Sequence, residues 1–316
     1  MKRICIALLL GLAAAGAHAQ AWPTKPVRII LQFPAGGSTD VVARILAQAL
    51  SGPLGQPVIV ENRPGADGAI AADVVMRSEP DGHTYFLASN TPMMQVPLLR
   101  KAPPYDPVKN FTAVSLVGRY VYVMVSSPAL PAANARDFVA YAKANPGKLN
   151  YGSYSGVTQL MFTRLKSTGL DAQLIPYKGE GPTVADIIGG QIQFTYATPT
   201  STLSHIRDGK LRALAVLLPA RFGLLPDVPT AAEAGVPALT AGTWAALFGP
   251  AKLPPEITAR MNRELNAAMR RPDVKQKIDQ QGFELAGNTP EEMSAFLVEQ
   301  LGAWRKAFAD AGMQPE

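Results

Sequence analysis

The sequence predicts an α/β protein of two lobes around a cleft, in which each lobe has a mostly parallel sheet flanked by helices and two crossover strands join the lobes. At about 150 residues per domain, a chain of 316 residues has room for two domains. Strand and helix patterns alternate in two series of similar size, and no linker rich in glycine and serine separates them. Hydrophobic residues make up 47% of the chain and charged residues 17%, which indicates a globular core rather than disorder.

The N-terminal segment 1–19 has the features of a signal peptide. Lys2 and Arg3 form a basic start, and the apolar run over residues 4–17 is shorter than the roughly 20 residues of a membrane-spanning helix. Residues 17–19 (AHA) follow the small-x-small pattern of a cleavage site. We therefore expect cleavage after Ala19 and export to a bacterial periplasm.

The exported chain has few groups for metal or redox chemistry. The lone Cys5 lies at the start of the apolar run and far ahead of the cleavage site, so it is not placed for lipid modification, and cleavage removes it. The histidines that remain, His83 and His205, are too few for a Cys/His metal site, and no disulfide can form. Without Lys2 and Arg3, 28 basic residues face 24 acidic ones, and the net charge falls from +6 to +4 with no basic run. We expect no cofactor, no metal and no nucleic-acid partner.

The first lobe opens with the order βαβαβ. A β-branched run over residues 27–32 breaks at the glycine loop 33–37, and a helix with one apolar face follows over residues 41–50. Ser38 is expected to cap this helix, with Asp40 in its first turn, where a negative charge is favoured. The series continues with a strand at 58–60, a helix at 69–77 and a strand at 85–88.

The second series begins after two apolar runs, and its elements are again short. Strands are predicted at 114–117, 121–125, 149–151, 191–196 and 211–217, and helices at 137–143, 159–167 and 182–188. The runs 121–125 and 244–248 are candidate crossover strands. We place the first lobe at 22–120 and 246–316 and the second lobe at 121–245.

The C-terminal tail is helical and is expected to return to the first lobe. Ile257, Met261 and Leu265 share one helix face. Residues 289–292 (TPEE) form a capping box with proline at the first helical position.

Polar loops follow the predicted strands, where open α/β sheets bind ligands. In loop 33–39 the backbone of Gly36 and Gly37 can approach a ligand closely, and in loop 152–158 a second set of hydroxyls precedes a helix. Helix N-termini favour anions, and neutral donors without arginine suit a carboxylate. Ordinary turn chemistry and helix capping are the alternative interpretation of each loop. The candidate donors are Gly36, Gly37, Ser38, Thr39, Ser89, Asn90, Ser153, Tyr154, Ser155 and Thr158.

No catalytic constellation emerges from the sequence. His83 follows a Pro-Asp-Gly turn and is expected at the surface, and His205 is expected on a solvated helix face. Residues 152–156 (GSYSG) resemble a nucleophile elbow, but Tyr154 stands where the serine belongs. Residues 179–181 (GEG) place a glycine on each side of Glu180. They lack the remaining glycine spacing of a dinucleotide-binding fingerprint. We expect no enzyme activity. The roles of Lys178, as a surface residue or an anion contact, and of Trp244, as core or cleft wall, stay open.

Twelve short strings spread over nearly the whole exported chain resemble the Bug solute-binding receptors of tripartite tricarboxylate transporters, and they occur in the same order. They are residues 22–26, 33–40, 55–57, 60–65, 80–82, 105–107, 146–151, 176–179, 189–191, 209–216, 225–230 and 233–235.

The resemblance implies a two-lobe periplasmic binding protein fold of the type II kind that closes on a small organic acid without catalysis or cofactor. It also implies that loops 33–40 and 152–158 face the cleft and hold a carboxylate. Phe33 and Ala197 complete the candidate ligand-binding set on this basis.

Two departures from the family pattern bear on the ligand. Many members have an aspartate in place of Ala197, which can pair with a ligand ammonium, and a frequent histidine is Met161 here. Loss of the aspartate argues against an amino-acid ligand, because a buried ammonium needs a partner. Tyr154, with Phe33 or Tyr196 where they reach the cleft, makes the pocket more aromatic. We expect an aromatic or weakly polar carboxylate rather than a citrate-like acid.

The resemblance also implies partners. The closed receptor, expected as a monomer, would dock on the membrane subunits of a tripartite tricarboxylate transporter. The alternatives are a ligand-sensing receptor for a sensor kinase and an exported enzyme that processes carboxylates.

Overall fold

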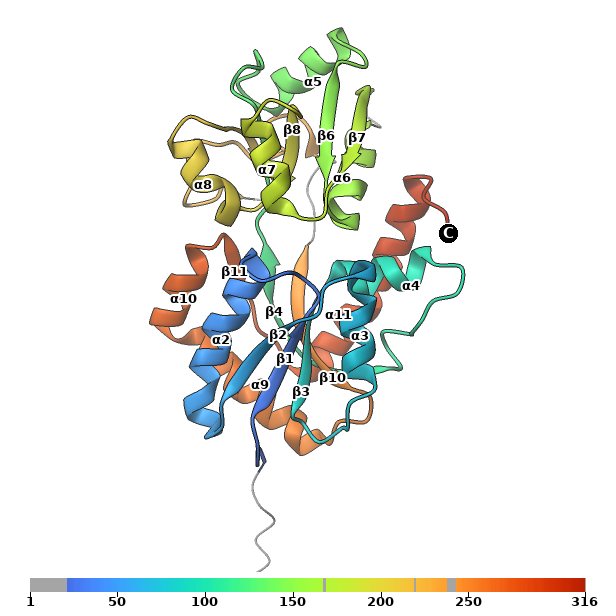
Figure 1. Ribbon diagram of the computed structural model, residues 1–316, viewed down its shortest axis with the longest axis vertical. Helices are drawn as coiled ribbons and strands as arrows, with labels where there is room; N and C mark the ends of the chain where they lie inside the picture. The colour runs from blue at the N-terminus through green and yellow to red at the C-terminus, as the bar shows by residue number, and fades with distance from the viewer. Residues whose placement is uncertain (1–21, 167–168, 219, 238–242, 316) are drawn as a thin grey trace, which may run out of the picture.

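The computed structural model describes residues 22–166, 169–218, 220–237 and 243–315. The predicted signal peptide, with Cys5, lies outside these residues. Figure 1 shows two lobes stacked along the long axis, with a separate sheet and its own helices in each. Within the described ranges no helix is long and apolar enough to cross a membrane. The predicted two-lobe α/β architecture is therefore confirmed.

The first sheet has the strand order β11-β4-β10-β3-β1-β2. Strand β1 pairs in parallel with β2 and β3, whereas β10 is antiparallel to both β3 and β4, and β11 is antiparallel to β4. Strands β1 to β4 consequently run in one direction, so that β1 and β3 end at the same edge of the sheet. The bounds are β1 Val27–Leu31, β2 Val58–Asn62, β3 Thr84–Ser89, β4 Phe111–Tyr120, β10 Trp244–Pro250 and β11 Phe283–Leu285.

The second sheet has the order β7-β6-β8-β5-β9. Strand β6 is parallel to β7 and β8, and β5 is antiparallel to β8 and β9. The strands other than β5 thus share one direction. The bounds are β5 Val123–Ser126, β6 Leu149–Ser153, β7 Ala172–Pro176, β8 Phe194–Ala197 and β9 Arg212–Val216.

Helices flank both sheets (Figure 1). In the first lobe they are α2 Ser38–Leu54, α3 Ala69–Met76, a π-turn η2 Thr91–Gln95, α4 Val96–Leu99, α9 Pro255–Arg270, α10 Pro272–Asp279 and α11 Pro290–Asp310. In the second lobe they are α5 Ala135–Ala144, α6 Gly156–Lys166, α7 Glu180–Ile188 and α8 Pro199–Arg207. The capping box at Thr289 and Glu292 is confirmed, and α9 and α11 contact β4 of the first sheet. The segment 91–99, α10 and β11 had no sequence prediction.

The chain passes from the first sheet to the second between β4 and β5. At this crossing the Val121 N–H donates to Gly282 O, and Tyr122 O accepts from the Leu217 N–H. Strand β5 belongs wholly to the second sheet and β10 wholly to the first. Of the two predicted crossover strands, the run 121–125 includes the segment that passes from the first lobe to the second. The run 244–248 lies after the chain has returned to the first lobe.

The buried apolar residues form three clusters. Tyr85, Leu87 and Leu247 of the first sheet are buried under α2, α9 and α10. Val125 and Val216 of the second sheet pack against α7. The third cluster includes residues of both sheets, such as Phe86 and Phe194, so the apolar packing is continuous between the lobes in this arrangement.

Candidate functional site

The N-terminus of α2 is the first part of the site. The N-cap residue is Gly37, which has no side chain to cap the helix. The predicted cap at Ser38 is therefore wrong. Ser38 is instead the first helical residue. Its hydroxyl is buried, with 6% of the residue exposed, and has no partner among the described residues. An unpaired hydroxyl beside the free N–H groups of a helix start is suited to bind an anion.

Thr39 links this helix start to the crossing. Its Oγ1 lies 2.6 Å from the hydroxyl of Tyr120, in a buried hydrogen bond between residues 81 positions apart. Tyr120 ends β4, and its ring stacks edge-on against Phe283 with the centroids 4.9 Å apart. The helix start is thereby anchored to the last residue before the chain crosses.

A polar network behind α2 holds the glycine loop. The Asp40 carboxylate accepts from the Gly36 N–H at 3.0 Å and from two nitrogens of Arg44, both at 2.9 Å. Asn62 donates to both Asp40 and the carbonyl of Phe33, each at 3.0 Å. Burial alone would raise the pKa of Asp40, but the hydrogen bonds from Arg44, Gly36 and Asn62 outweigh it and the pKa is lowered. Gly36 itself has φ +88°, which favours glycine.

The polar residues after β3 are committed to partners within the protein. Ser89 lies 2.6 Å from the side chain of Gln32, and Asn90 accepts from the Trp244 N–H at 2.8 Å. Trp244 is 1% exposed, and its ring packs near Phe248, so it is a core residue. The structure thus joins Ser89 and Asn90 to the framework of the first sheet.

The second predicted loop is organised by Thr158. Its Oγ1 accepts from the N–H groups of Tyr154 and Ser155 at 3.1 and 3.0 Å and donates to Ser155 O at 2.8 Å. The hydroxyls of Ser153 and Ser155 lie 3.2 and 3.3 Å from the same atom. These bonds cap α6, which is the alternative interpretation given to this loop. Thr158 is fully buried, so it shapes the loop from behind.

Tyr154, a predicted site residue, lies beside the crossing with Tyr120, Tyr122 and Glu180, which the sequence analysis did not select. Burial raises the pKa values of Tyr120, Tyr122 and Tyr154, and the charge of Glu180 raises each of them further. Tyr154 also donates to Tyr196 O at 3.1 Å. The sequence did carry a signal for Glu180: it is an acidic residue that opens a helix between two glycines.

Glu180 is held at the start of α8. Its carboxylate accepts from the N–H and the hydroxyl of Thr198, the latter at 3.2 Å, and from the Ser201 hydroxyl at 2.7 Å. Burial raises the pKa of Glu180, although these hydrogen bonds oppose the rise. The side chain is half-buried rather than enclosed. An acidic group therefore lies near Tyr154 in the second lobe.

Other predicted residues lie apart from these groups. Ala197 and Tyr196 are both 0% exposed, so Tyr196 does not reach a cleft surface, while Phe33 is half-buried. His83 is 7% exposed, and its Nε2 accepts from the Thr24 N–H at 3.2 Å, so the expectation of a surface histidine is wrong. His205 is half-buried on α8, and Lys178 is exposed.

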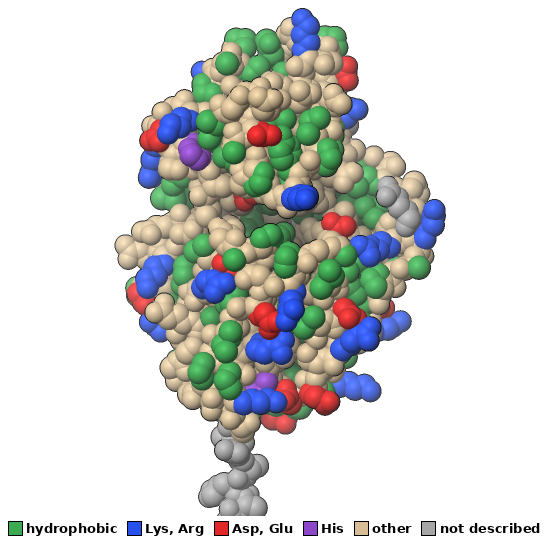
Figure 2. Space-filling view, viewed as in Figure 1, with side chains coloured by type: hydrophobic (Ala, Val, Ile, Leu, Met, Phe, Trp, Pro, Cys, Tyr) green, Lys and Arg blue, Asp and Glu red, His purple; other side chains and the backbone are tan. Residues whose placement is uncertain are grey.

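The two lobes touch each other away from the crossing chain. A methyl group built on Gly156 would lie 1.4 Å from Oε1 of Gln95, so η2 packs directly on the start of α6. The Thr200 hydroxyl of α8 donates to Gln281 O at 2.5 Å. On the face of the molecule drawn in Figure 2, the surface is hollowed where the two lobes meet. The loops after β1 and β6 therefore belong to lobes in contact.

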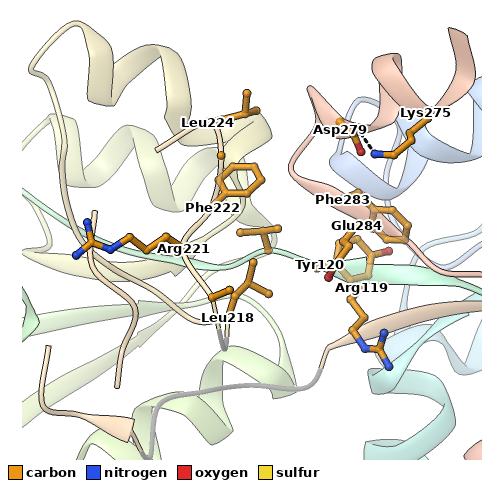
Figure 3. A pocket seen from close by; sticks show the side chains of 13 residues that line it. Arg119, Tyr120, Leu218, Arg221, Phe222, Leu224, Lys275, Asp279, Phe283 and Glu284 are labelled. Atoms are coloured by element: carbon orange, nitrogen blue, oxygen red, sulfur yellow. Dashed lines mark hydrogen bonds and ion pairs between the residues drawn. The ribbon is translucent and has the colours of Figure 1, made fainter. Parts of the chain in front are cut away.

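A groove of about 850 Å³ also has walls from both lobes. Figure 3 shows Leu218, Phe222 and Leu224 on the side of the second lobe, and Tyr120 and Phe283 opposite them. Lys275 and Asp279 form an ion pair of 2.6 Å at its edge. Tyr120 lines this groove and also forms the hydrogen bond to Thr39. The groove therefore adjoins the crossing between β4 and β5.

Among the described residues no group of three or more His, Cys, Asp or Glu side chains is arranged to hold a metal ion. The groups that the structure does bring together are hydroxyls, helix starts, tyrosines and a single glutamate. Such an arrangement can bind a small polar molecule through neutral donors.

Comparison with known proteins assigns the family. Residues 42–313 match the model of the tripartite tricarboxylate transporter family receptor. The chain is 35% identical to protein BugT of Bordetella pertussis over 322 residues, which covers 99% of this chain and 98% of BugT. The periplasmic binding protein BugD is 31% identical with a TM-score of 0.85, covering 93% of this chain and 100% of BugD. An R. palustris protein solved with adipate is 30% identical with a TM-score of 0.88, covering 93% of this chain and 100% of that protein. The chain therefore belongs to the tripartite tricarboxylate transporter family receptors of the Bug group, which are periplasmic solute-binding proteins and not enzymes.

Proposed function

We propose that this receptor captures a small organic carboxylate between its lobes, with the start of α2 as the principal carboxylate contact. The observation that carries the proposal is the buried, unpartnered hydroxyl of Ser38 on a helix start that has no side-chain cap. Burying a hydroxyl without a partner costs about 1–3 kcal/mol, and a bound carboxylate would recover it. The adipate in a relative with 30% identity supports a ligand of this class.

Capture would occur by closure of two lobes, predicted as 22–120 with 246–316 and 121–245, except that Trp244 and Ala245 belong to the first lobe because they begin β10. The ligand contacts would be Gly36, Gly37, Ser38 and Thr39 from the first lobe and Ser153, Tyr154 and Ser155 from the second, with Phe33, Ser89, Asn90, Thr158 and Ala197 shaping their surroundings. A ligand that touches both lobes favours the closed state only by the difference in its affinity for the two states.

The aromatic surroundings favour an aromatic or weakly polar acid over a citrate-like one. Tyr122 and Tyr154, which are both half-buried, supply that character, whereas Tyr120 and Tyr196 are buried. Delivery to the membrane subunits of a tripartite transporter, by a monomer whose signal peptide is cleaved near Ala19, completes the proposal.

A thermal-unfolding screen of the exported chain tests the ligand class. Dicarboxylates, tricarboxylates, aromatic acids and amino acids would each be added in large excess. A ligand at about a thousand times its Kd stabilises a protein by roughly 4 kcal/mol, which moves the midpoint by several degrees. A shift confined to carboxylates supports the proposal, and a panel without any shift contradicts it. Tight binding of citrate with no response to aromatic acids would contradict the aromatic preference alone.

A further inference from the structure

Asp40 places a negative charge at the same helix start that the proposed function assigns to the ligand carboxylate. It stands in the first turn of α2, two residues after Ser38. Although burial raises the pKa of Asp40, its hydrogen bonds lower the pKa below the ordinary value, so the carboxyl is ionised near neutral pH. Two anions at one helix start repel each other and compete for its positive end. A ligand carboxylate therefore binds well there only when the charge of Asp40 is offset.

Arg44 supplies this offset from one turn further along α2. Its Nε and Nη2 each donate to one oxygen of the Asp40 carboxylate at 2.9 Å, which makes a bidentate ion pair. The Asp40 side chain is 5% exposed and the Arg44 side chain is 51% exposed, so the guanidinium covers the carboxylate on its solvent side. Among the described residues, Arg44 is the cation that pairs with Asp40.

The same carboxylate holds the glycine loop, so Arg44 acts on the loop through Asp40. Asp40 Oδ2 accepts from the Gly36 N–H at 3.0 Å as well as from Arg44 Nε. Asn62 completes the group, because it donates to Asp40 Oδ1 and to Phe33 O, each at 3.0 Å. Its own oxygen accepts from Arg44 Nη2 at 3.1 Å. The guanidinium can thus influence the proposed ligand contacts without touching the ligand.

We propose that Arg44 is a positioning residue for carboxylate capture, because it cancels the charge of Asp40 and lets that carboxylate hold the glycine loop without repelling the ligand. The inference deepens the proposed function and rests on it. Affinity for a carboxylate should then follow the net charge of the side chains at positions 40 and 44. Asp40 without its cation would repel the ligand, and Arg44 without its anion would attract it.

A purely structural role of this ion pair predicts a different pattern. If the pair only held the loop in shape, loss of either partner would weaken ligand binding, and loss of both partners would not repair it. The charge role predicts that the two single substitutions change affinity in opposite directions and that their effects cancel in the double variant. The sign of each change therefore separates the two explanations.

The test is a cycle of four proteins, each the full exported chain: the wild type, Arg44→Gln, Asp40→Asn and the double variant. The two amides of the double variant can still bond each other across one helical turn. Calorimetry with benzoate, adipate, succinate and citrate as probes measures Kd. For the acid that binds best, Arg44→Gln should weaken binding about tenfold and Asp40→Asn should strengthen it severalfold. The double variant should return to within about threefold of the wild type.

Two further variants complete the test. Arg77→Gln removes the cation of an exposed i,i+4 pair with Asp73 on α3, so it is the matched control and should leave Kd unchanged. Arg44→Lys keeps the charge but loses the bidentate geometry, and it should bind like the wild type. It tests the charge role even where Asp40→Asn does not fold.

The outcomes separate the two proposals. Unchanged affinity in Arg44→Gln, or weaker binding in Arg44→Gln, Asp40→Asn and the double variant alike, would overturn the role of Arg44 and leave the receptor function standing. An Arg44→Lys protein that binds as weakly as Arg44→Gln would overturn it as well. Failure of all four acids to bind the wild-type protein would overturn the proposed function, and this inference with it.

Discussion

Ser38 shows how a single hydroxyl distinguishes a binding role from a structural one. A capping serine would bond its own helix and stabilise the empty protein. The hydroxyl of Ser38 is buried and makes no such bond among the described residues. Removal of this hydroxyl should therefore leave the stability of the ligand-free protein unchanged and should lower its affinity for the ligand.

Ser38→Ala should weaken binding of the best carboxylate by about 1.5 kcal/mol, the loss of a hydrogen bond to a charged group. The midpoint of thermal unfolding without ligand should stay the same or rise, because no hydrogen bond is lost. Calorimetry and thermal unfolding measure the two effects. Ser294→Ala, on the exposed face of α11, serves as the control. A lower midpoint with unchanged affinity would show that Ser38 is structural.

Asp40 supports the glycine loop through its charge, so its contribution depends on pH. Its pKa is lowered in the folded protein, so the stabilisation is complete above the ordinary value of 3.8 and is lost as the pH falls below that value. Asp40→Asn should therefore destabilise the protein by roughly 1–3 kcal/mol near neutrality. The difference from the wild-type protein should shrink in acid, as urea unfolding at a series of pH values would measure.

The control for Asp40 is Asp73→Asn on α3, whose pair with Arg77 is exposed. Exposed pairs contribute little, so this variant should stay close to the wild-type protein at every pH. A destabilisation by Asp40→Asn that is constant from neutral pH to acid would contradict the assignment.

At the scale of elements, η2 and α6 form a contact between the lobes. Gly156 begins α6, and a Cβ there would lie 1.4 Å from Oε1 of Gln95 on η2, so the Gln95 side chain would have to leave its place between the lobes. The contact belongs to the arrangement in which the lobes touch, so a residue that blocks it should oppose closure.

Gly156→Ala should weaken ligand binding by about tenfold, the scale of overpacking a tight contact. Small-angle scattering with saturating ligand should show a more extended molecule than the wild-type protein. Gln95→Ala added to Gly156→Ala should restore both properties, because it removes the atoms that collide. If the double variant stays impaired, the defect lies within α6 and not between the lobes.

At the scale of the whole molecule, two separate sheets joined by a short crossing between β4 and β5 suit lobes that move about a hinge. The groove in Figure 3 has walls from both lobes, so its shape must change when the lobes move. It therefore offers a place to observe closure without touching the proposed ligand contacts.

Phe222→Trp places an indole on the second-lobe wall of this groove. The native tryptophans Trp22, Trp244 and Trp304 all lie in the first lobe, with Trp244 at the start of β10 in the first sheet, so they should report little of the motion. Ligand should shift the emission of the new indole by several nanometres, with the same Kd as calorimetry gives. If saturating ligand leaves the emission maximum of the new tryptophan unchanged, closure of the lobes about the β4–β5 crossing is contradicted.

The sequence by itself determined the alternation of strands and helices and the C-terminal capping box, because these depend on local periodicity and on turn and capping residues. Only the tertiary structure decided that β10 lies inside the first sheet, that His83 is buried and that the hydroxyl of Ser38 is left unpaired. It also brought the Glu180 carboxylate to the hydroxyls of Thr198 and Ser201 at the start of α8. Contacts between residues far apart in the chain leave no periodic signal, so they become visible only when the two lobes are folded and in contact.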